Sequence, residues 1–183
     1  MNILITGVAG LLGSRLATWI LDNTDHQVTG LDNLSGGYIE NVDDRVDFHQ
    51  IDLMENFDKI EELFKSKNFD IVYHLAAYAA EGLSPFIRVF NYKNNLMSSV
   101  NLINNSIKYD VKRFVFTSSM AVYGGSQNPP FEESLIPSPI DPYGIAKFSV
   151  EQDLKVAHTQ HGLDYTIIRP HNVYGMNQNI WDR

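Results

Sequence analysis

Cysteine is absent from the 183 residues of this chain, which excludes a disulfide framework and any site that binds a metal through thiolates. Apolar runs are also short, because none reaches the roughly 18 residues that a membrane-spanning helix requires. The apolar beginning, from Ile3 to Leu12, has no basic leader and is interrupted by glycines, so we interpret it as a strand and a turn instead of a signal peptide. We therefore expect a cytoplasmic protein with no membrane partner.

Positive charge is in deficit as well. The chain has 14 lysine and arginine residues against 22 aspartate and glutamate residues, which gives a formal net charge of −8, and the basic residues are scattered. Nucleic acids and anionic membranes are bound by clustered basic surfaces, so we expect neither as a partner. None of the six histidines stands beside carboxylates at a spacing typical of metal ligands, and we expect no metal site.

Short apolar runs typical of buried strands alternate with amphipathic helical patterns along the chain. The patterns predict strands at 2–6, 27–31, 46–51, 70–75, 113–118 and 165–169, and helices at 11–21, 57–64, 85–109 and 143–158. Within the first helix, the spacing predicts one buried face formed by Leu12, Leu16, Trp19 and Ile20. Alternating helices and nearly continuous apolar strands predict an α/β fold with a doubly wound parallel sheet.

Three glycines lie in the turn between the first predicted strand and the first predicted helix. Gly7 would permit a tight turn, Gly10 would let the backbone approach a ligand, and Gly13 would let the helix pack closely on the strand. The N–H groups at the start of the helix would then face an anion such as a pyrophosphate. A glycine-rich turn alone is also typical of an ordinary tight turn, so both interpretations stay open at this point.

Asp32 lies 19 residues after Gly13, at the end of the second predicted strand. An acidic residue at this place would bind the ribose hydroxyls of NAD and repel the extra phosphate of NADP, and no arginine follows it directly. Taken alone, Asp32 is equally compatible with a turn at Asp32-Asn33. Together with the glycine turn in register, it predicts a Rossmann domain that binds NAD.

Tyr143 and Lys147 are four residues apart on a predicted helix, so they share a face. A phenol with a pKa of about 10 is a poor base at neutral pH, but a neighbouring ammonium favours the phenolate. Tyr143 could then take a proton from a substrate hydroxyl, and Ser119, just after the fifth predicted strand, could orient that hydroxyl. The competing interpretations are an ordinary helix face for Tyr143 and Lys147, and a polar strand end for Ser119.

Taken together, these motifs resemble the extended short-chain dehydrogenase/reductase family, in its NAD-dependent nucleotide-sugar epimerase/dehydratase branch, and are closest to the 4-epimerases of the UDP-glucose type. The resemblance covers nearly the whole chain. The matching segments are Gly7-x-x-Gly10-x-x-Gly13, Asp32-Asn33-Leu34-Ser35, Asp52-Leu53, His74-Leu75-Ala76-Ala77, Asn95, Thr117-Ser118-Ser119-x-x-Val122-Tyr123-Gly124, Tyr143-x-x-x-Lys147 and Arg169-Pro170-x-Asn172-Val173-Tyr174-Gly175.

The resemblance implies roles for these positions. Tyr143 would be the catalytic acid and base, Lys147 would modify its pKa and bind the nicotinamide ribose, and Ser119 would bond the substrate hydroxyl. Tyr143 and Lys147 would both contact the cofactor. The remaining cofactor contacts would come from Gly7, Gly10, Leu11, Leu12, Gly13, Asp32, Asn33, Asp52, Leu53, Leu75, Ala76, Ala77 and Asn95, and the substrate contacts from Ser119, Met120 and Asn172. Ala76 and Ala77 are also ordinary core residues, and Asn95 could serve only to tie down a helix.

One departure narrows the activity that the resemblance implies. The 4,6-dehydratases of this family carry Asp-Glu directly after the serine position, whereas this chain carries Met120 and Ala121, which cannot transfer a proton. We therefore expect an isomerase that epimerises a nucleotide sugar, such as a UDP-hexose, by transient oxidation of its 4-hydroxyl. A dehydratase or reductase of the same family, an oxidoreductase on another alcohol, and a module that binds NAD without turnover stay open as alternatives.

The resemblance also implies an assembly and a division of the chain. In the family, two long helices corresponding to 85–109 and 143–158 pair across a homodimer as a four-helix bundle, so we expect a homodimer. We expect residues 1–175 to form the NAD-binding domain that carries the Ser/Tyr/Lys group. Residues 176–183 would begin a truncated substrate-binding region.

Overall fold

A single parallel sheet of six strands organises the chain in a computed structural model, which describes residues 1–125, 129–176 and 178. The strand order is β3-β2-β1-β4-β5-β6, the doubly wound arrangement that the sequence predicts. The strands are β1 (Asn2–Thr6), β2 (Gln27–Asp32), β3 (Asp47–Gln50), β4 (Ile71–His74), β5 (Arg113–Thr117) and β6 (Tyr165–Ile168). All five strand pairs are parallel, so the six carboxyl ends meet at one edge.

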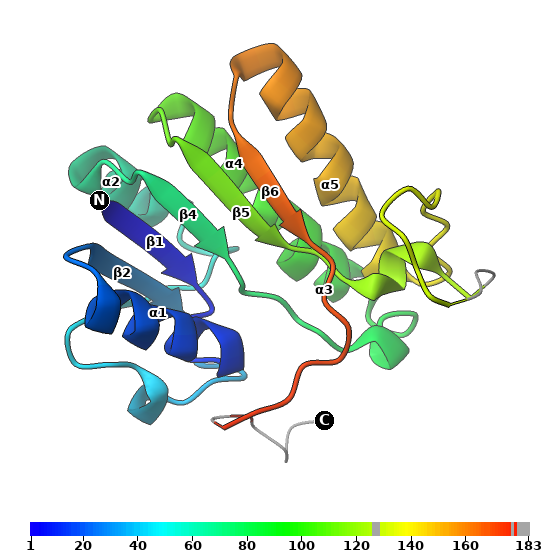
Figure 1. Cartoon of the computed structure of the whole chain (residues 1–183), viewed down its shortest axis with the longest axis horizontal. Coiled ribbons are helices and arrows are strands. Elements are labelled where there is room, and N and C mark those ends of the chain that lie inside the picture. Colours follow the sequence, from blue (N-terminus) through cyan, green and yellow to red (C-terminus); the bar gives the residue numbers. More distant parts are fainter. Residues whose placement is uncertain (126–128, 177, 179–183) are drawn as a thin grey trace.

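The helices cover the two faces of the sheet unequally. They are α1 (Leu11–Asn23), α2 (Phe57–Lys67), α3 (Arg88–Tyr92), α4 (Ser98–Lys108) and α5 (Pro142–His161), with the π-helical turn η3 (Lys93–Met97) and the short 3₁₀ turns η1 (Ile39–Asn41), η2 (Glu81–Leu83) and η4 (Met120–Tyr123). Figure 1 shows α1 on one side of the sheet and α2, α4 and α5 on the other. The larger apolar core lies on the side of α2, α4 and α5, and the smaller core lies under α1.

Helix α5 has well-defined ends and a largely buried face. Asp141 caps its first turn by accepting a hydrogen bond from the Gly144 N–H at 2.9 Å, and Pro142 occupies the first helical position. Gly162 ends it in the left-handed region, with φ of +75°, and donates its N–H to the His158 carbonyl. These ends fix the register of α5 and therefore the height of its side chains relative to the sheet.

The helix expected at 85–109 begins three residues later and contains an irregularity. The segment from Arg88 to Lys108 runs as α3, the π turn η3 and α4 without interruption. A π turn inserts one extra residue into a helix and rotates the side chains around it. Here it accompanies the burial of Asn95.

The predicted buried face of α1 is wrong at two of its four positions. Trp19 is 61% exposed and Leu12 is 38% exposed. Besides the predicted Ile20, the helix buries Gly13, Ser14 and Ala17, and the small size of these residues brings its axis close to the sheet. This close approach leaves larger residues on its flanks directed toward solvent.

Two further expectations concern a second region at 176–183 and the lack of a membrane-spanning helix. Of the segment 176–183, residues 177 and 179–183 lie outside the described part, so the expected second region is not placed. Within the described ranges, no helix combines the length and apolarity needed to cross a membrane.

Candidate active site

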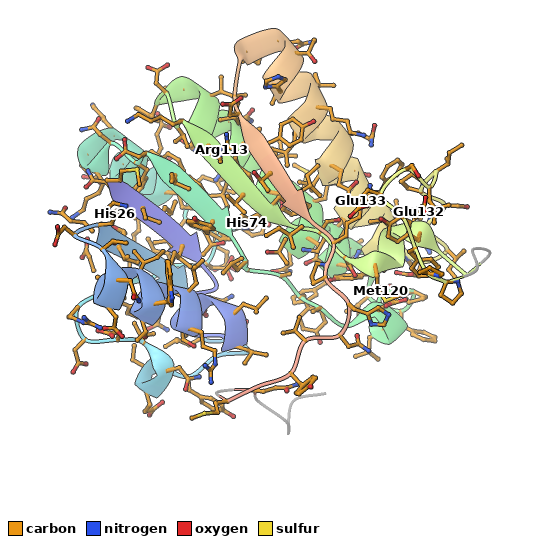
Figure 2. The ribbon with its side chains drawn as sticks, viewed as in Figure 1. His26, His74, Arg113, Met120, Glu132 and Glu133 are labelled. Carbon is orange, nitrogen blue, oxygen red and sulfur yellow. The ribbon has the colours of Figure 1, made fainter. Side chains whose placement is uncertain are left out.

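The residues that the sequence singles out gather at the carboxyl edge of the sheet. Each strand ends beside at least one of them: Gly7 follows β1, Asp32 ends β2, Asp52 follows β3, Leu75, Ala76 and Ala77 follow β4, Ser119 follows β5 and Asn172 follows β6. Figure 2 shows Met120 at this edge and Arg113, at the start of β5, at the opposite one. Ligands of open parallel sheets bind at the carboxyl edge.

The glycine turn between β1 and α1 is held by close backbone contacts. Gly7 has φ of +74°, and its N–H donates to the Leu31 carbonyl at 2.8 Å. A Cβ on Gly7 would lie 2.8 Å from the Ala76 nitrogen, and a Cβ on Gly13 would collide with the Gly7 carbonyl. Gly7 and Gly13 are therefore needed for close backbone packing, whereas the space beside Gly10 is largely open.

The start of α1 fits a pyrophosphate. Gly10 is the N-cap residue, it supplies no side-chain hydrogen bond, and the first turn contains no acidic residue. A Cβ on Gly10 would have only the Gly7 oxygen within 4 Å, at 3.3 Å, so the backbone is open to a ligand. The N–H groups of Leu11, Leu12 and Gly13 in this uncapped turn are the donors that an anion at a helix start requires.

Asp32 both shapes the glycine turn and remains able to bind a ribose. One carboxylate oxygen accepts from the Ala9 N–H at 3.0 Å, and the other accepts from the Leu34 N–H at 2.8 Å. Each oxygen keeps a further acceptor site. The neighbouring Asn33 side chain donates to Asp52 at 2.8 Å, which joins the ends of β2 and β3 beside the half-buried Leu53.

Tyr143 and Ser119 meet at the end of β5. The Tyr143 ring is 7% exposed. Burial raises the pKa of Tyr143 above its usual value, a hydrogen bond with Ser119 lowers this pKa, and the carboxylates of Glu81 and Asp141 raise it. The Ser119 hydroxyl also accepts from the Ala121 N–H at 3.1 Å, which leaves its own proton free for the phenol oxygen.

Lys147 lies beneath Tyr143 with little access to solvent. It is 2% exposed, and its Nζ donates to the Thr117 carbonyl at 2.8 Å. The same Nζ lies 4.9 Å from the centre of the Phe116 ring and 5.7 Å from that of the Tyr143 ring. Burial lowers the pKa of Lys147 to about 7, so this group exchanges protons near neutral pH. The structure thus brings Ser119, Tyr143 and Lys147 together.

Asn95 holds the chain that follows β4. Its side chain accepts from the Tyr78 N–H at 2.8 Å and donates to the Tyr78 carbonyl at 3.0 Å. It also donates to the Asn91 oxygen at 2.8 Å, and Asn91 donates to the Pro142 carbonyl at 2.9 Å. Asn95 therefore ties the segment after Ala77 to the first turn of α5, next to Tyr143.

Ser84 and Asn91 are two residues at this site that the sequence analysis does not find. The buried Ser84 hydroxyl accepts from the Tyr143 N–H at 3.2 Å, so both residues hold the backbone that carries the phenol. Each lies about 50 residues or more from its partner in α5. The sequence carries no signal for them, because their function depends on a contact between distant segments.

His74 is a buried structural link. Its Nδ1 lies 2.7 Å from the Thr6 hydroxyl and its Nε2 lies 2.8 Å from the Ser99 hydroxyl. Burial lowers the pKa of His74 to about 3, so the ring is neutral at physiological pH. The Ala76 N–H donates to the Thr6 hydroxyl at 3.2 Å, which connects the ends of β1 and β4. No cluster of metal-ligating side chains occurs in the described part of the chain.

The expected substrate contacts lie at the outer side of the same edge. Met120 is half-buried, and its N–H donates to the Pro170 carbonyl at 3.1 Å, which brings the segment after β6 beside Ser119. Asn172 is exposed two residues further on. Residues 171–176 then pass along the carboxyl edge toward α1 (Figure 1), where Arg15 Nε donates to the Met176 carbonyl at 3.5 Å.

The chain matches known proteins along nearly its whole length. The family model described as "NAD dependent epimerase/dehydratase family" matches residues 3–181. A putative UDP-glucose 4-epimerase from Methanocaldococcus jannaschii is 32% identical over 178 residues, which are 97% of this chain and 57% of that relative. The UDP-glucose 4-epimerase of Halalkalibacterium halodurans is 32% identical over 179 residues, or 98% of this chain and 53% of that relative. The chain thus spans a little over half the length of these curated relatives.

Solved structures agree with these relatives. A Thermotoga maritima UDP-glucose 4-epimerase in complex with UDP-glucose superposes with a TM-score of 0.94 at 38% identity, covering 99% of this chain and 59% of that one. A Thermus thermophilus UDP-glucose 4-epimerase in complex with NAD gives a TM-score of 0.92 at 34% identity, covering 98% of this chain and 58% of that one.

We predict that Gly13→Ala destabilises the chain, because the new Cβ would collide with the Gly7 backbone. The expected loss in free energy of unfolding is about 1–3 kcal/mol, as for an overpacked core position. Gly36→Ala is the matched control, since a Cβ there meets nothing within 4 Å. Urea unfolding would measure both, and equal stability of the two variants would contradict the prediction.

We also predict that Lys147 makes stability depend on pH. In the unfolded chain a lysine holds its proton up to its usual pKa of about 10.4, whereas folded Lys147 loses it above about 7. Between these values the unfolded state binds more protons, so the free energy of unfolding rises with pH by up to about 1.4 kcal/mol per unit. Below about pH 7 this contribution levels off.

Lys147→Met should remove that slope, while Lys155→Met, on the exposed face of the same helix, should keep it. Urea unfolding of the three proteins at intervals from pH 7 to pH 10 measures the slope. If the Lys147→Met protein kept the slope of the original chain, a group other than Lys147 would be responsible for the pH dependence of stability.

Proposed function

This chain belongs to the NAD-dependent epimerase/dehydratase family, and we propose that it binds NAD and forms the proton-transfer half of a nucleotide-sugar 4-epimerase acting on a UDP-hexose. The observation that carries the proposal is the meeting of Ser119, Tyr143 and Lys147 at the carboxyl edge that also holds the glycine turn. The UDP-glucose 4-epimerases among its relatives and structural neighbours support the substrate class.

The proposed cofactor site follows from the fit of the glycine turn. The open N–H groups after Gly10 would hold the pyrophosphate, and Asp32 would bind the adenosine ribose and disfavour a 2′-phosphate. When bound, NAD supplies a hydride acceptor that can return the hydride to the substrate. Lys147 and Tyr143 would contact the nicotinamide ribose and the reacting hydroxyl, respectively.

The chain's own residues would manage one proton. Tyr143 as phenolate would take the proton of the sugar 4-hydroxyl while the hydride leaves C4, and it would return that proton when the hydride reaches the other face of the 4-keto sugar. A protonated Lys147 favours the phenolate by its charge, and the Ser119 hydrogen bond favours it too. The reaction therefore causes no net oxidation or reduction, because one proton and one hydride leave the sugar and both return to it.

Met120 and Ala121 support epimerisation over dehydration. Elimination of water requires an additional acid and base beside the sugar, and neither side chain after Ser119 can carry a proton. A dehydrogenase would use the same residues but would accumulate reduced cofactor. Because the chain spans little more than half of its relatives, binding of NAD without turnover is the second candidate.

The chain, and any longer natural protein that contains it, should convert UDP-galactose to UDP-glucose when NAD is present. Tyr143→Phe should lower this rate by about a hundredfold or more, because the phenol that moves the proton is lost. NAD affinity should stay within about twofold, since binding relies on the glycine turn. Tyr109→Phe, a partner of Glu61 far from the site, should leave both unchanged.

The outcomes separate the candidates. Steady accumulation of NADH would indicate a dehydrogenase and contradict epimerisation. Binding of NAD with no conversion of any UDP-hexose in either protein would leave the binding module as the function.

We further propose a homodimer through α3–α4 and α5. Apolar side chains on both helices are exposed, including Val89 at 71%, Met97 at 49% and Val156 at 48%. Burial of such side chains between two copies would stabilise the pair. A cytoplasmic location, which the lack of cysteine favours, belongs to the same proposal.

Sedimentation at tens of micromolar should therefore show a dimer. Val89→Glu or Val156→Glu should shift it to monomers, because a carboxylate would be buried at the contact. Trp19→Glu, at an apolar residue on α1 whose exposure of 61% lies between those of Val89 and Val156, should leave the dimer intact. A monomeric original chain would contradict the proposal.

A further inference from the structure

Behind the Ser119, Tyr143 and Lys147 group lies a buried ion pair that the proposed reaction does not use. The Glu151 side chain on α5 has no exposed surface, and that of Arg169, just after β6, is 16% exposed. Arg169 Nε donates to Glu151 Oε1 at 2.9 Å, and Nη2 donates to Oε2. The Ser118 hydroxyl also donates to Oε1, at 2.6 Å.

The ion pair also contacts Tyr123, in the 3₁₀ turn after β5. Arg169 Nη1 donates to the Tyr123 hydroxyl at 2.9 Å, and the guanidinium carbon lies 4.9 Å from the centre of the Tyr123 ring. Tyr123 closes the 3₁₀ turn that begins at Met120. One carboxylate and one guanidinium thus connect α5, the end of β5, the turn after it and the chain that leads to Asn172.

Side chains on one face of α5 reach the end of β5. Three residues of α5 spaced by four, Tyr143, Lys147 and Glu151, share one face of the helix. They reach three consecutive residues at the end of β5. Lys147 donates to the Thr117 carbonyl, Glu151 accepts from the Ser118 hydroxyl, and the Tyr143 phenol lies near enough to the Ser119 hydroxyl for that group to lower the pKa of Tyr143. A shift of Ser118 would therefore move the partners of both Tyr143 and Lys147.

Stability alone gives little reason for a charged pair at this place. Removing two charges from water is unfavourable, and apolar residues of similar volume are often as stable as a buried ion pair. What a bidentate pair supplies is a fixed geometry, because two parallel hydrogen bonds set both distance and orientation. The ion pair lies where the segments that carry the proposed proton-transfer residues meet.

We propose that Glu151 and Arg169 are positioning residues whose ion pair fixes Ser119 and the Thr117 carbonyl relative to Tyr143 and Lys147. The inference rests on the proposed function for its catalytic consequence only. Its structural consequence, a change in the surroundings of Lys147, can be measured in the chain without substrate or cofactor.

The decisive variant is Glu151→Met with Arg169→Met, which removes both charges and so leaves neither one buried without a partner. Thermal unfolding would first confirm that it is folded. We expect the pKa of Lys147, followed by NMR of ¹³C-labelled lysine and assigned with Lys147→Met, to rise by about one unit or more, since a loosened contact admits water. NADH affinity should change by less than about threefold.

In a protein with epimerase activity, the double variant should lower kcat about tenfold or more with little change in KM, because the lost alignment acts on the reacting group. Glu151→Gln with Arg169→Gln, which also removes both charges but keeps side chains that can hydrogen-bond, should change the pKa of Lys147 and kcat in the same directions by less. This second double variant also decides the question if the first one does not fold. Glu61→Gln, in the exposed Glu61–Lys108 pair, should change neither quantity.

Either double variant, if folded and with the original pKa of Lys147, would overturn the inference and leave the ion pair a purely structural role. Unchanged kcat in such a protein would overturn it as well. If the original chain binds NAD but epimerises nothing, the proposed function fails, while the NMR measurement still decides the inference.

Discussion

The close approach of the backbone around the glycine turn is the constraint on which the carboxyl edge depends. Gly13 lets α1 rest on the Gly7 carbonyl, and Gly7 in turn touches the backbone of Ala76 at the end of β4. Helix α1, strand β1 and the chain after β4 therefore meet without an intervening side chain. This arrangement leaves the first turn of α1 uncapped at the place where an anion can reach its N–H groups.

A second contact, between α5 and the end of β5, positions the residues of the proposed proton transfer. Polar side chains of α5 contact the residues at the end of β5, and further hydrogen bonds with Ser84 and Asn91 hold the first turn of the same helix. The backbone of Tyr143 is consequently held by Ser84, while its hydroxyl lies beside Ser119. Such support from rigid elements keeps a reacting group in place before substrate arrives.

Much of this was predictable from the sequence, for identifiable reasons. The strands and the doubly wound order follow from the alternation of apolar runs and helical patterns, which is a local signal. The glycine turn, Asp32 and the Tyr143–Lys147 pair also depend on short spacings. The buried face of α1 was predicted wrongly at Trp19 because periodicity favours large apolar residues, whereas close packing on the sheet selected Ala17.

The links that support the site were not predictable, since they join residues far apart in the chain. Asn91 and Pro142, or Ser118 and Glu151, have no sequence relation that marks them as partners. Glu151 did carry a weak signal, because a charged residue four positions after Lys147 falls on the buried face of the same helix. The structure is needed to show that the charge of the Glu151 carboxylate is paired with Arg169, which follows β6.

Lys147 is buried and Arg169 is half-buried, and their surroundings have opposite effects on their pKa values. Arg169 faces the Glu151 carboxylate, whose hydrogen bonds raise the pKa of the guanidinium further above its usual value. Within the described part of the chain, Lys147 contacts the Thr117 carbonyl and the Phe116 and Tyr143 rings, and burial lowers the pKa of Lys147 to about 7. A permanent charge thus lies behind the candidate site, and a titratable one lies beside Tyr143, where the proposed reaction exchanges a proton.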